Sequence, residues 1–402
     1  MPNNKQTSSY LQGLTRLIVD TTIGLTNLVE TMHKRIVHPP LLPSTPIQHL
    51  ITHIAGISYK NIRWSTELIG KNLDKALGQL DSVLGEIKTT SEKKAIRSAL
   101  NGVVGDYLEE NKNPLKITMQ FRYLSKPITL NHQNLGVIYP RINGKILLMV
   151  HGACMNDLQW RRKGHNHGEA LAEELNKTPI YLHYNSGRHI STNGKDLSEL
   201  LENLILTWPV AIEELVIVSH SMGGLVSRSA IHYGMQKHKT WTTYLKKIVF
   251  LGTPHHGAPL ERTGNYLDVI LESIPYAKPF ARLGKVRSAG ITDLRYGNLI
   301  DEDWSDKDRF QLQKDPRQPI PLPEHVDCYS IAAVIGKENK SLSHRIVGDS
   351  LVDLKSALGQ HSNPSKNLAF KKNSTWIAFE NNHLDLLNNP KVYCQIKAWL
   401  IS

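Results

Sequence analysis

The sequence predicts an α/β fold in which a mostly parallel central sheet is flanked by helices. From residue 114 to the end of the chain, short apolar runs of strand length alternate with helical segments. The runs at 145–150 and 215–219 are apolar almost throughout, as expected for strands buried on both faces. A chain of 402 residues, 40% of them hydrophobic, is long enough to bury such a core.

The first 113 residues predict a helical region that precedes the sheet. Apolar residues recur at helical spacing between residues 10 and 85, and the prolines between residues 39 and 46 divide this pattern into two parts. A third helix is expected from Ser91 to about residue 111. The amphipathic stripes favour packing against the core, and contact with a membrane surface is the alternative.

The sheet is expected within a second region, residues 114–402. Strands are predicted at 116–123, 145–150, 179–184, 215–219, 247–251, 326–334 and 375–379, and helices at 168–176 and 196–208. The stretch 258–323 between two of these strands predicts a cap insertion, which either covers the site or docks permanently on the core. In such a sheet the active site gathers at the carboxyl ends of the strands.

The strand at 215–219 runs directly through a short turn, SHSMGG at 219–224, into a helix. A strand, a tight turn and a helix in this order form a nucleophile elbow, which holds Ser221 above the edge of the sheet. This pattern usually has glycine two residues before the serine, where strand and helix approach closely. Ser219 is small and adds only a hydroxymethyl group, so Ser221 remains the candidate nucleophile.

The strand at 145–150 ends in His151-Gly152-Ala153, a position from which a backbone amide can reach an oxyanion. The N–H groups of Ala153 and Met222 are the predicted donors of an oxyanion hole. One such donor is typically worth about 3 kcal/mol in the transition state. His151 is expected to order the loop rather than to act as a base.

A carboxylate and an imidazole follow the last two predicted strands. Asp349 lies in GDSLV (348–352), and His383 lies in NNHLD (381–385). Together with Ser221 they occur in the chain order Ser, Asp, His. We therefore predict that Ser221 attacks an acyl carbon, His383 takes and returns the proton, and Asp349 orients His383 and stabilises its charged form.

Taken together, LMVHGA, HSMGG, FLGTPHHGAPLE, GDSLV and NHLDLL resemble motifs of the α/β-hydrolase superfamily, in particular its lipase and GPI inositol-deacylase-like branch. The resemblance covers about residues 145–402. It implies an α/β-hydrolase fold and a serine esterase of lipid metabolism that cleaves lipid or other acyl esters without a cofactor. Ser350 stands where the family often has glycine, so Asp353 is the reserve candidate for the acid.

Two other functions remain open on the same residues. An acyltransferase would use the same triad with an alcohol as the acceptor. A non-catalytic scaffold would use the N-terminal helices to bind a membrane or a partner, and would leave Ser221 unreactive.

Three further side chains resemble metal ligands but complete no metal site in the sequence. Asp385 resembles a calcium ligand of some secreted bacterial lipases, yet no partner carboxylate can be assigned to it. His165 and His167 have no identifiable third ligand. His255 and His256, in the turn after the strand at 247–251, are expected to shape the pocket. We therefore predict neither a metal nor a cofactor.

The composition indicates which binding partners and which cellular compartment to expect. A net charge of +12 and a pI near 9.4 suit an anionic partner, but the basic residues are scattered and form no nucleic-acid motif. A solvated basic surface is therefore expected, with peripheral contact to an anionic membrane as the alternative. Three dispersed cysteines, no signal-like leader and no run of about 18 apolar residues predict a cytoplasmic protein. The sequence specifies no oligomeric state.

Overall fold

The computed structural model describes residues 90–139, 141–258, 271, 287–307, 315, 317–337, 348–349 and 351–402. The helices predicted between residues 10 and 85 lie outside these ranges, as does much of the predicted cap at 258–323. Among the described helices, each is too short or too polar to cross a membrane.

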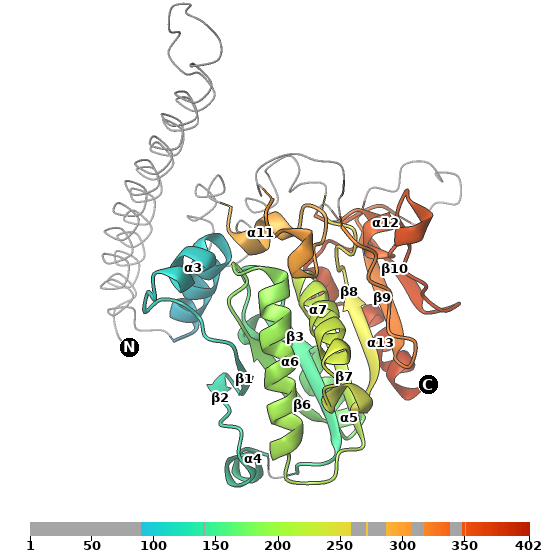
Figure 1. The fold of residues 1–402 in the computed structure, drawn as a ribbon. Helices are drawn as coiled ribbons and strands as arrows, with labels where there is room; N and C mark the ends of the chain where they lie inside the picture. The colour runs from blue at the N-terminus through green and yellow to red at the C-terminus, as the bar shows by residue number, and fades with distance from the viewer. Residues whose placement is uncertain are drawn as a thin grey trace, which may run out of the picture.

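Within the described residues, the central sheet has eight strands in the order β10-β9-β8-β7-β3-β6-β1-β2 (Figure 1). Neighbouring strands from β10 to β6 run parallel, whereas β1 pairs antiparallel with β6 and with β2. The strands are β1 (Gln120–Tyr123), β2 (Lys126–Pro127), β3 (Lys145–Val150), β6 (Thr178–His183), β7 (Glu214–His220), β8 (Leu245–Leu251), β9 (Asp327–Val334) and β10 (Thr375–Phe379). A separate short hairpin joins β4 (Arg161–Arg162) to β5 (His165–Asn166).

Helices flank the sheet, with α6 and α7 side by side across its middle (Figure 1). The α-helices are α3 (Thr90–Glu110), α4 (His132–Ile138), α5 (His167–Glu174), α6 (Ile190–Thr207), α7 (Met222–Gln236), α8 (Trp241–Tyr244), α11 (Ala289–Asp293), α12 (Leu354–Ala357) and α13 (Pro390–Ile401). The described residues also form the short 3₁₀ turns η1 (Asp157–Trp160), η3 (Asp301–Asp303), η4 (Pro364–Lys366) and η5 (Asp385–Leu387). The predicted mostly parallel α/β fold is confirmed.

Helix α3 packs into the same hydrophobic core as the sheet. Its apolar side chains Ile96, Leu100 and Leu108 are buried with those of the central strands. The helix also approaches the loops after β3 and β6 closely, since a Cβ atom added at Gly102 would lie 2.2 Å from Sγ of Cys154. This helix is therefore packed on the core, which is the arrangement that the sequence favoured for it. The predicted division into regions 1–113 and 114–402 stays a prediction.

The central strands end level with one another at their carboxyl ends. In the ladder, Val150 at the end of β3 pairs with Ser219, and His220 at the end of β7 pairs with Leu251 at the end of β8. The segments that leave these strands are consequently neighbours at one edge of the sheet. This edge is where a parallel sheet forms its ligand or active site.

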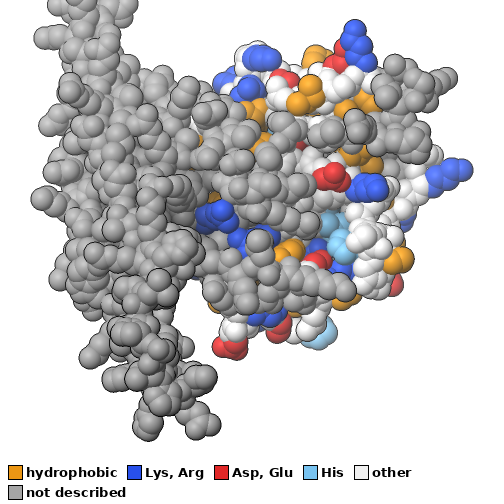
Figure 2. Space-filling view, turned by 90° about the horizontal axis from the view of Figure 1, so that it is seen from above, with side chains coloured by type: hydrophobic (Ala, Val, Ile, Leu, Met, Phe, Trp, Pro, Cys, Tyr) orange, Lys and Arg blue, Asp and Glu red, His pale blue; other side chains and the backbone are white. Residues whose placement is uncertain are grey.

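Charged side chains on the described surface are mixed in sign. Seen from above, Lys and Arg side chains are interspersed with acidic and apolar ones (Figure 2). Several of them are paired, for example Lys371 with Asp327 at 2.6 Å and Lys239 with Glu199 at 2.6 Å. Exposed pairs of this kind contribute little stability, about 0–1 kcal/mol.

Candidate active site

Ser221 stands in a strained turn between β7 and α7. Its backbone angles are φ 54° and ψ −126°, and φ values in this range are uncommon for residues other than glycine. Its N–H group donates a hydrogen bond to the carbonyl oxygen of Leu251 at 2.8 Å, which ties the turn to the end of β8. Ser221 also precedes the first residue of α7, where the helix dipole favours negative charge.

Ser219 and Gly223, two residues before and two residues after Ser221, differ in the space available for a side chain. Ser219 is fully buried, and its hydroxyl donates to the carbonyl oxygen of Val249 at 3.3 Å. At Gly223 a Cβ atom would lie 2.4 Å from the carbonyl oxygen of His151 and 2.6 Å from that of Val150. Glycine is therefore required two residues after Ser221, whereas serine fits two residues before it.

His383 and Asp349 are in direct contact, and both are buried. Nδ1 of His383 lies 2.5 Å from Oδ2 of Asp349. The other carboxylate oxygen, Oδ1, accepts hydrogen bonds from the backbone N–H groups of Leu351 at 3.0 Å and Val352 at 2.8 Å. An ionised carboxylate only accepts, so Nδ1 of His383 is the donor and Nε2 of the neutral ring has the free lone pair. That Nε2 atom is buried and has no hydrogen-bond partner among the described residues.

The ring of His383 packs over the ends of β7 and β8. A Cβ atom added at Gly252, which has φ 59°, would lie 3.0 Å from Cε1 of His383. Gly252 follows Leu251, whose carbonyl oxygen accepts the N–H of Ser221. The imidazole therefore lies next to the turn that presents Ser221.

His220 links the elbow to the loop that contains His383. Its Nε2 atom lies 3.2 Å from the carbonyl oxygen of His383, and the two rings have centroids 4.7 Å apart. Because a carbonyl oxygen only accepts, Nε2 of His220 must be the donor. Burial lowers the pKa of His220 well below 6.5, and the nearby His383 lowers this pKa further. His220 therefore stays neutral beside the candidate base.

The loop after β3 lies against Ser221. A Cβ atom added at Gly152 would lie 3.0 Å from Cβ of Ser221, and the next residue, Ala153, is buried. Met222, the second predicted oxyanion donor, is the fully buried first residue of α7. Both predicted amides thus lie in the surroundings of Ser221, and their role as donors stays a prediction.

His151 is a structural part of this loop. Its Nδ1 atom lies 2.8 Å from the carbonyl oxygen of Gly152, and its ring stacks on Tyr184 with centroids 4.4 Å apart. The Tyr184 hydroxyl also donates to the carbonyl oxygen of His151 at 2.9 Å. Burial lowers the pKa of His151 to about 4. These contacts fit the expectation that His151 orders the loop.

A buried ion pair beside the same loop could not be predicted from the sequence. Arg122 on β1 donates to Asp157 in η1 at 3.0 Å, and both side chains are buried. His183 at the end of β6 adds an Nδ1 atom 3.8 Å from the same carboxylate. The pair joins residues that are 35 positions apart, so no local pattern could have indicated it.

The reserve acid and the potential calcium ligand have other contacts. Asp353 caps α12 and accepts the N–H of Lys355 at 2.8 Å. Asp385 accepts the N–H of Asn382 at 3.1 Å and lies 3.6 Å from Nζ of Lys163. Among the described residues, Asp349 is thus the carboxylate in contact with His383. The neighbouring Ser350 lies outside the described residues.

The two predicted histidine pairs are held by other protein groups. Nε2 of His165 lies 2.8 Å from Nδ1 of His167, whose own Nε2 donates to the carbonyl oxygen of Leu386 at 3.0 Å. His255 and His256 each contact an arginine, at 3.4 Å in both cases. In the described part of the chain, His, Cys, Asp and Glu side chains form no group of three that could hold a metal ion.

Part of the chain matches a known family model, and several solved structures are similar to it. Residues 141–318 match the model of the PGAP1-like alpha/beta domain. No curated protein matches the chain. The mature lipase BlEst2 of Bacillus licheniformis is 16% identical, with a TM-score of 0.43 over 71% of this chain and 98% of its own. The esterase EstA of Clostridium botulinum is 13% identical, with a TM-score of 0.36 over 73% and 93% of the two chains. An esterase of Pyrococcus furiosus is 14% identical, with a TM-score of 0.35 over 64% and 81%.

The family match and the geometry of the sheet agree. The matched residues include β3, β6, β7 and β8, the strands that form the middle of the parallel sheet. The central strand β7 leads into a helix through a serine with positive φ. Residues 141–318 of this chain are therefore similar to the PGAP1-like alpha/beta domain, and they form the middle of a mostly parallel α/β sheet.

Proposed function

We propose that this protein is a carboxylic ester hydrolase that works through an acyl-enzyme on Ser221. The observation that carries the proposal is the contact of His383 Nδ1 with Asp349 Oδ2 at 2.5 Å. The imidazole ring of His383 also packs over the turn that contains Ser221. A buried carboxylate on Nδ1 leaves Nε2 as the basic atom of the imidazole. A base of this kind beside a serine in a tight turn is the arrangement that activates a hydroxyl as a nucleophile.

The reaction divides into acylation and deacylation. Oγ of Ser221 attacks the ester carbonyl carbon while Nε2 of His383 takes its proton, and Asp349 stabilises the resulting imidazolium. The backbone N–H groups of Ala153 and Met222 bind the oxyanion of the tetrahedral intermediate. The protonated His383 then gives its proton to the leaving alcohol. A water molecule that loses a proton to His383 then attacks the acyl carbon, and His383 returns this proton to Oγ of Ser221 as the bond to the acyl group breaks, which releases the acid and restores the hydroxyl.

The substrate class in this proposal is an acyl ester, including lipid esters. Its support is the set of motifs that resembles lipases and GPI inositol deacylases, together with the PGAP1-like match. We also propose a cytoplasmic protein with at most peripheral membrane contact. All three cysteines are unpaired, and Cys154 and Cys328 are buried, which fits a reducing compartment.

The test is the reactivity of Ser221. A fluorophosphonate probe should label the wild-type protein, and Ser221→Ala should abolish both the labelling and the hydrolysis of p-nitrophenyl esters, with a loss of about 10³-fold or more. Ser227→Ala is a matched control, because Ser227 is buried on helix α7, which Ser221 precedes, and its hydroxyl donates to the carbonyl oxygen of Gly223 at 2.8 Å. This variant should keep its labelling.

Other results of this experiment would distinguish the alternative functions. Full esterase activity in Ser221→Ala would contradict the proposal. An unreactive wild-type serine in a folded protein would favour the non-catalytic scaffold. Formation of a new ester when an alcohol is added, in place of free acid, would identify an acyltransferase. A series of acyl chains from short to long, with and without anionic vesicles, would then separate a soluble esterase from a lipase that acts at a membrane surface.

A further inference from the structure

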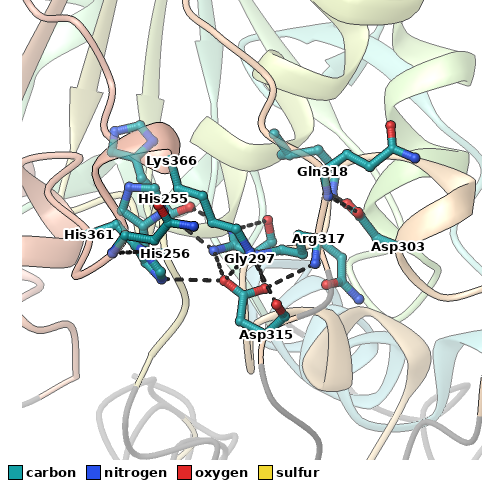
Figure 3. Close-up of polar contacts among 12 residues, drawn as sticks. His255, His256, Gly297, Asp303, Asp315, Arg317, Gln318, His361 and Lys366 are labelled. Atoms are coloured by element: carbon teal, nitrogen blue, oxygen red, sulfur yellow. Dashed lines mark hydrogen bonds and ion pairs between the residues drawn. The ribbon is translucent and has the colours of Figure 1, made fainter.

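A small cavity of about 20 Å³ lies beside helix α7, behind the loop that follows β8. Its lining includes Arg228 from α7, His255 and His256 from the loop, and Arg317 and Lys366. Asp315 contacts both Arg317 and Lys366 at this place, with His255 and His256 beside them (Figure 3). A volume of about 10–15 Å³ holds one water-sized probe, so the cavity has room for a single small species.

Arg228 is buried here without a compensating charge in contact. The residue is 5% exposed. Among the described residues, its polar contacts are the carbonyl oxygen of Ile320, 2.6 Å from Nη2, and Nδ1 of His255, 3.4 Å from Nη1. Its Nε atom is buried with no hydrogen-bond partner there. A guanidinium remains protonated, and a buried charge without a partner costs several kcal/mol.

The other arginine of the cavity is fully compensated. Arg317 forms a two-point pair with Asp315, with Nε 2.9 Å from Oδ1 and Nη2 2.9 Å from Oδ2. Nζ of Lys366 also contacts this carboxylate, at 3.0 Å from Oδ2. One Asp315 carboxylate is therefore shared by two cations, so it cannot also neutralise Arg228.

Asp315 is not on the lining itself, and the carboxylate that does line the cavity, Asp303, accepts hydrogen bonds from the backbone. Its Oδ2 atom accepts hydrogen bonds from the N–H groups of Leu299 at 2.8 Å and Ile300 at 3.3 Å. Burial raises the pKa of Asp303. Burial also lowers the pKa of His256 to about 3 and that of His255 well below 6.5, so both imidazoles are neutral. Among the described residues at this place, the three cations Arg228, Arg317 and Lys366 stand against the two carboxylates Asp303 and Asp315, which leaves a surplus of one positive charge.

Two hydrogen-bond donors on the lining also lack an acceptor among the described residues. Nδ1 of His255 faces a guanidinium nitrogen, which can only donate, so Nδ1 accepts and the proton of the neutral ring is on Nε2. This Nε2 atom, like Nε of Arg228, is buried and has no partner among the described residues. The cavity thus combines an uncompensated positive charge, unpaired donors and space for one small species.

We propose that this cavity binds one small monovalent anion of halide size, such as chloride, next to Arg228. One such ion neutralises the surplus charge and accepts from the unpaired donors. The cavity is too small for phosphate or for a fatty acid, so the ligand is not the ester substrate or its products. This site is independent of the esterase function proposed above.

The bound anion joins three parts of the fold. Arg228 lies about two helical turns beyond Ser221 on α7. The loop with His255 packs on the start of this helix, since a Cβ atom at Gly224 would lie 2.0 Å from Oγ1 of Thr253. The chain at residues 317–320 closes the third side through the bond from Arg228 to Ile320. Loss of the anion should therefore loosen the contact of residues 317–320 with α7.

The experiment compares the thermal unfolding of the full chain in sodium chloride and in sodium gluconate at equal ionic strength. Gluconate is too large for the cavity. Chloride should raise Tm saturably, by roughly 2–4 °C at ten times its Kd. Arg228→Met, which keeps the aliphatic stem and removes the charge, should abolish this rise. Arg161→Met is the matched control, because Arg161 is an exposed arginine paired with Glu169, and it should keep the rise.

Crystals of the wild-type protein soaked in bromide provide a second measurement, which does not depend on the folding of a variant. An anomalous peak beside Arg228 is expected. Equal Tm values in the two salts, a chloride effect that survives in Arg228→Met, or an empty or water-filled cavity in the bromide map would each overturn the proposal.

Discussion

The hydroxyl of Ser219 donates a hydrogen bond to the backbone carbonyl oxygen of Val249 on the neighbouring strand, at 3.3 Å. Elbows usually have glycine at this position, two residues before the nucleophile. Here the added hydroxymethyl group is fully buried but has a polar partner, so its desolvation is compensated. Serine in place of glycine at residue 219 therefore fits the packing here and leaves the turn at Ser221 intact.

Replacement of this side chain should affect stability according to size and polarity. Ser219→Gly removes one buried hydrogen bond, so we expect a loss of about 1 kcal/mol in the free energy of unfolding and little change in kcat. Ser219→Val adds volume and leaves the hydroxyl contact unmade, so a loss of about 1–3 kcal/mol is expected. Urea denaturation with parallel esterase assays measures both. Wild-type stability in both variants would contradict this account of the site.

Asp349 and Asp353 can be separated by matched substitutions. Asp349→Asn should lower kcat by about 10⁴-fold, because an amide in contact with Nδ1 no longer fixes the required tautomer of His383. Asp353→Asn should keep most of the activity, since asparagine also caps a helix such as α12. Steady-state kinetics on a soluble ester distinguishes them. The reverse pattern would make Asp353 the catalytic acid.

Gly252 should be essential because of what it contacts. Gly252→Ala places a methyl group 3.0 Å from the His383 ring on a residue with φ 59°, so the base shifts and kcat should fall on the order of 10²-fold. Gly164→Ala is the matched control, since Gly164 also has a positive φ, 81°, but nothing lies within 4 Å of the added methyl group. The control should lose about 1 kcal/mol of stability and retain its kcat. Similar kcat losses in both variants would show that backbone strain, and not contact with His383, is the cause.

Stability should fall on mild acidification because of the buried neutral histidines. The pKa of His151 is about 4 in the folded protein against about 6.5 in the unfolded chain, so the unfolded chain binds more protons between these values. The free energy of unfolding should therefore decrease as pH falls from about 6.5 to about 4, by up to about 3 kcal/mol for His151 alone. His167, whose pKa is also lowered to about 4, adds to the slope.

Denaturant unfolding at several pH values measures this slope. His151→Gln should make it shallower, whereas the same change at the exposed His132 should leave it unchanged. A free energy of unfolding that stays constant from pH 7 to pH 4 would rule out burial of these histidines in the neutral form.

The features that the sequence predicted well are those with a local signal. The strand at 145–150 and the elbow at Ser221 combine an apolar run with a characteristic turn, and the expected order of Ser, Asp and His led to two residues that are in contact. Helix α6 begins at Ile190, whereas the sequence predicted a start at residue 196. The start was missed because the N-cap residue His189 makes no side-chain capping bond, so the sequence has no capping signal there.

Strand β1 is shorter than predicted for a tertiary reason. Residues 116–123 alternate like a strand, but only Gln120–Tyr123 pair in the sheet. The backbone N–H of Ile117 donates instead to Oδ1 of Asn101, and the carbonyl oxygen of Leu115 accepts from the side chains of Arg97 and Asn101. Side chains of α3 thus satisfy backbone groups that would otherwise extend the strand, and no local pattern encodes this contact.

These contacts of α3 have a consequence for the limits of the folding unit. The helix buries Ile96, Leu100 and Leu108, satisfies the backbone around residue 116 and receives a hydrogen bond from Ser288, whose Oγ atom lies 2.6 Å from the carbonyl oxygen of Gly102. A shortened chain that begins at residue 114 would expose this part of the interior to water and leave buried backbone groups without partners. The smallest autonomously folding part of this protein therefore has to include α3.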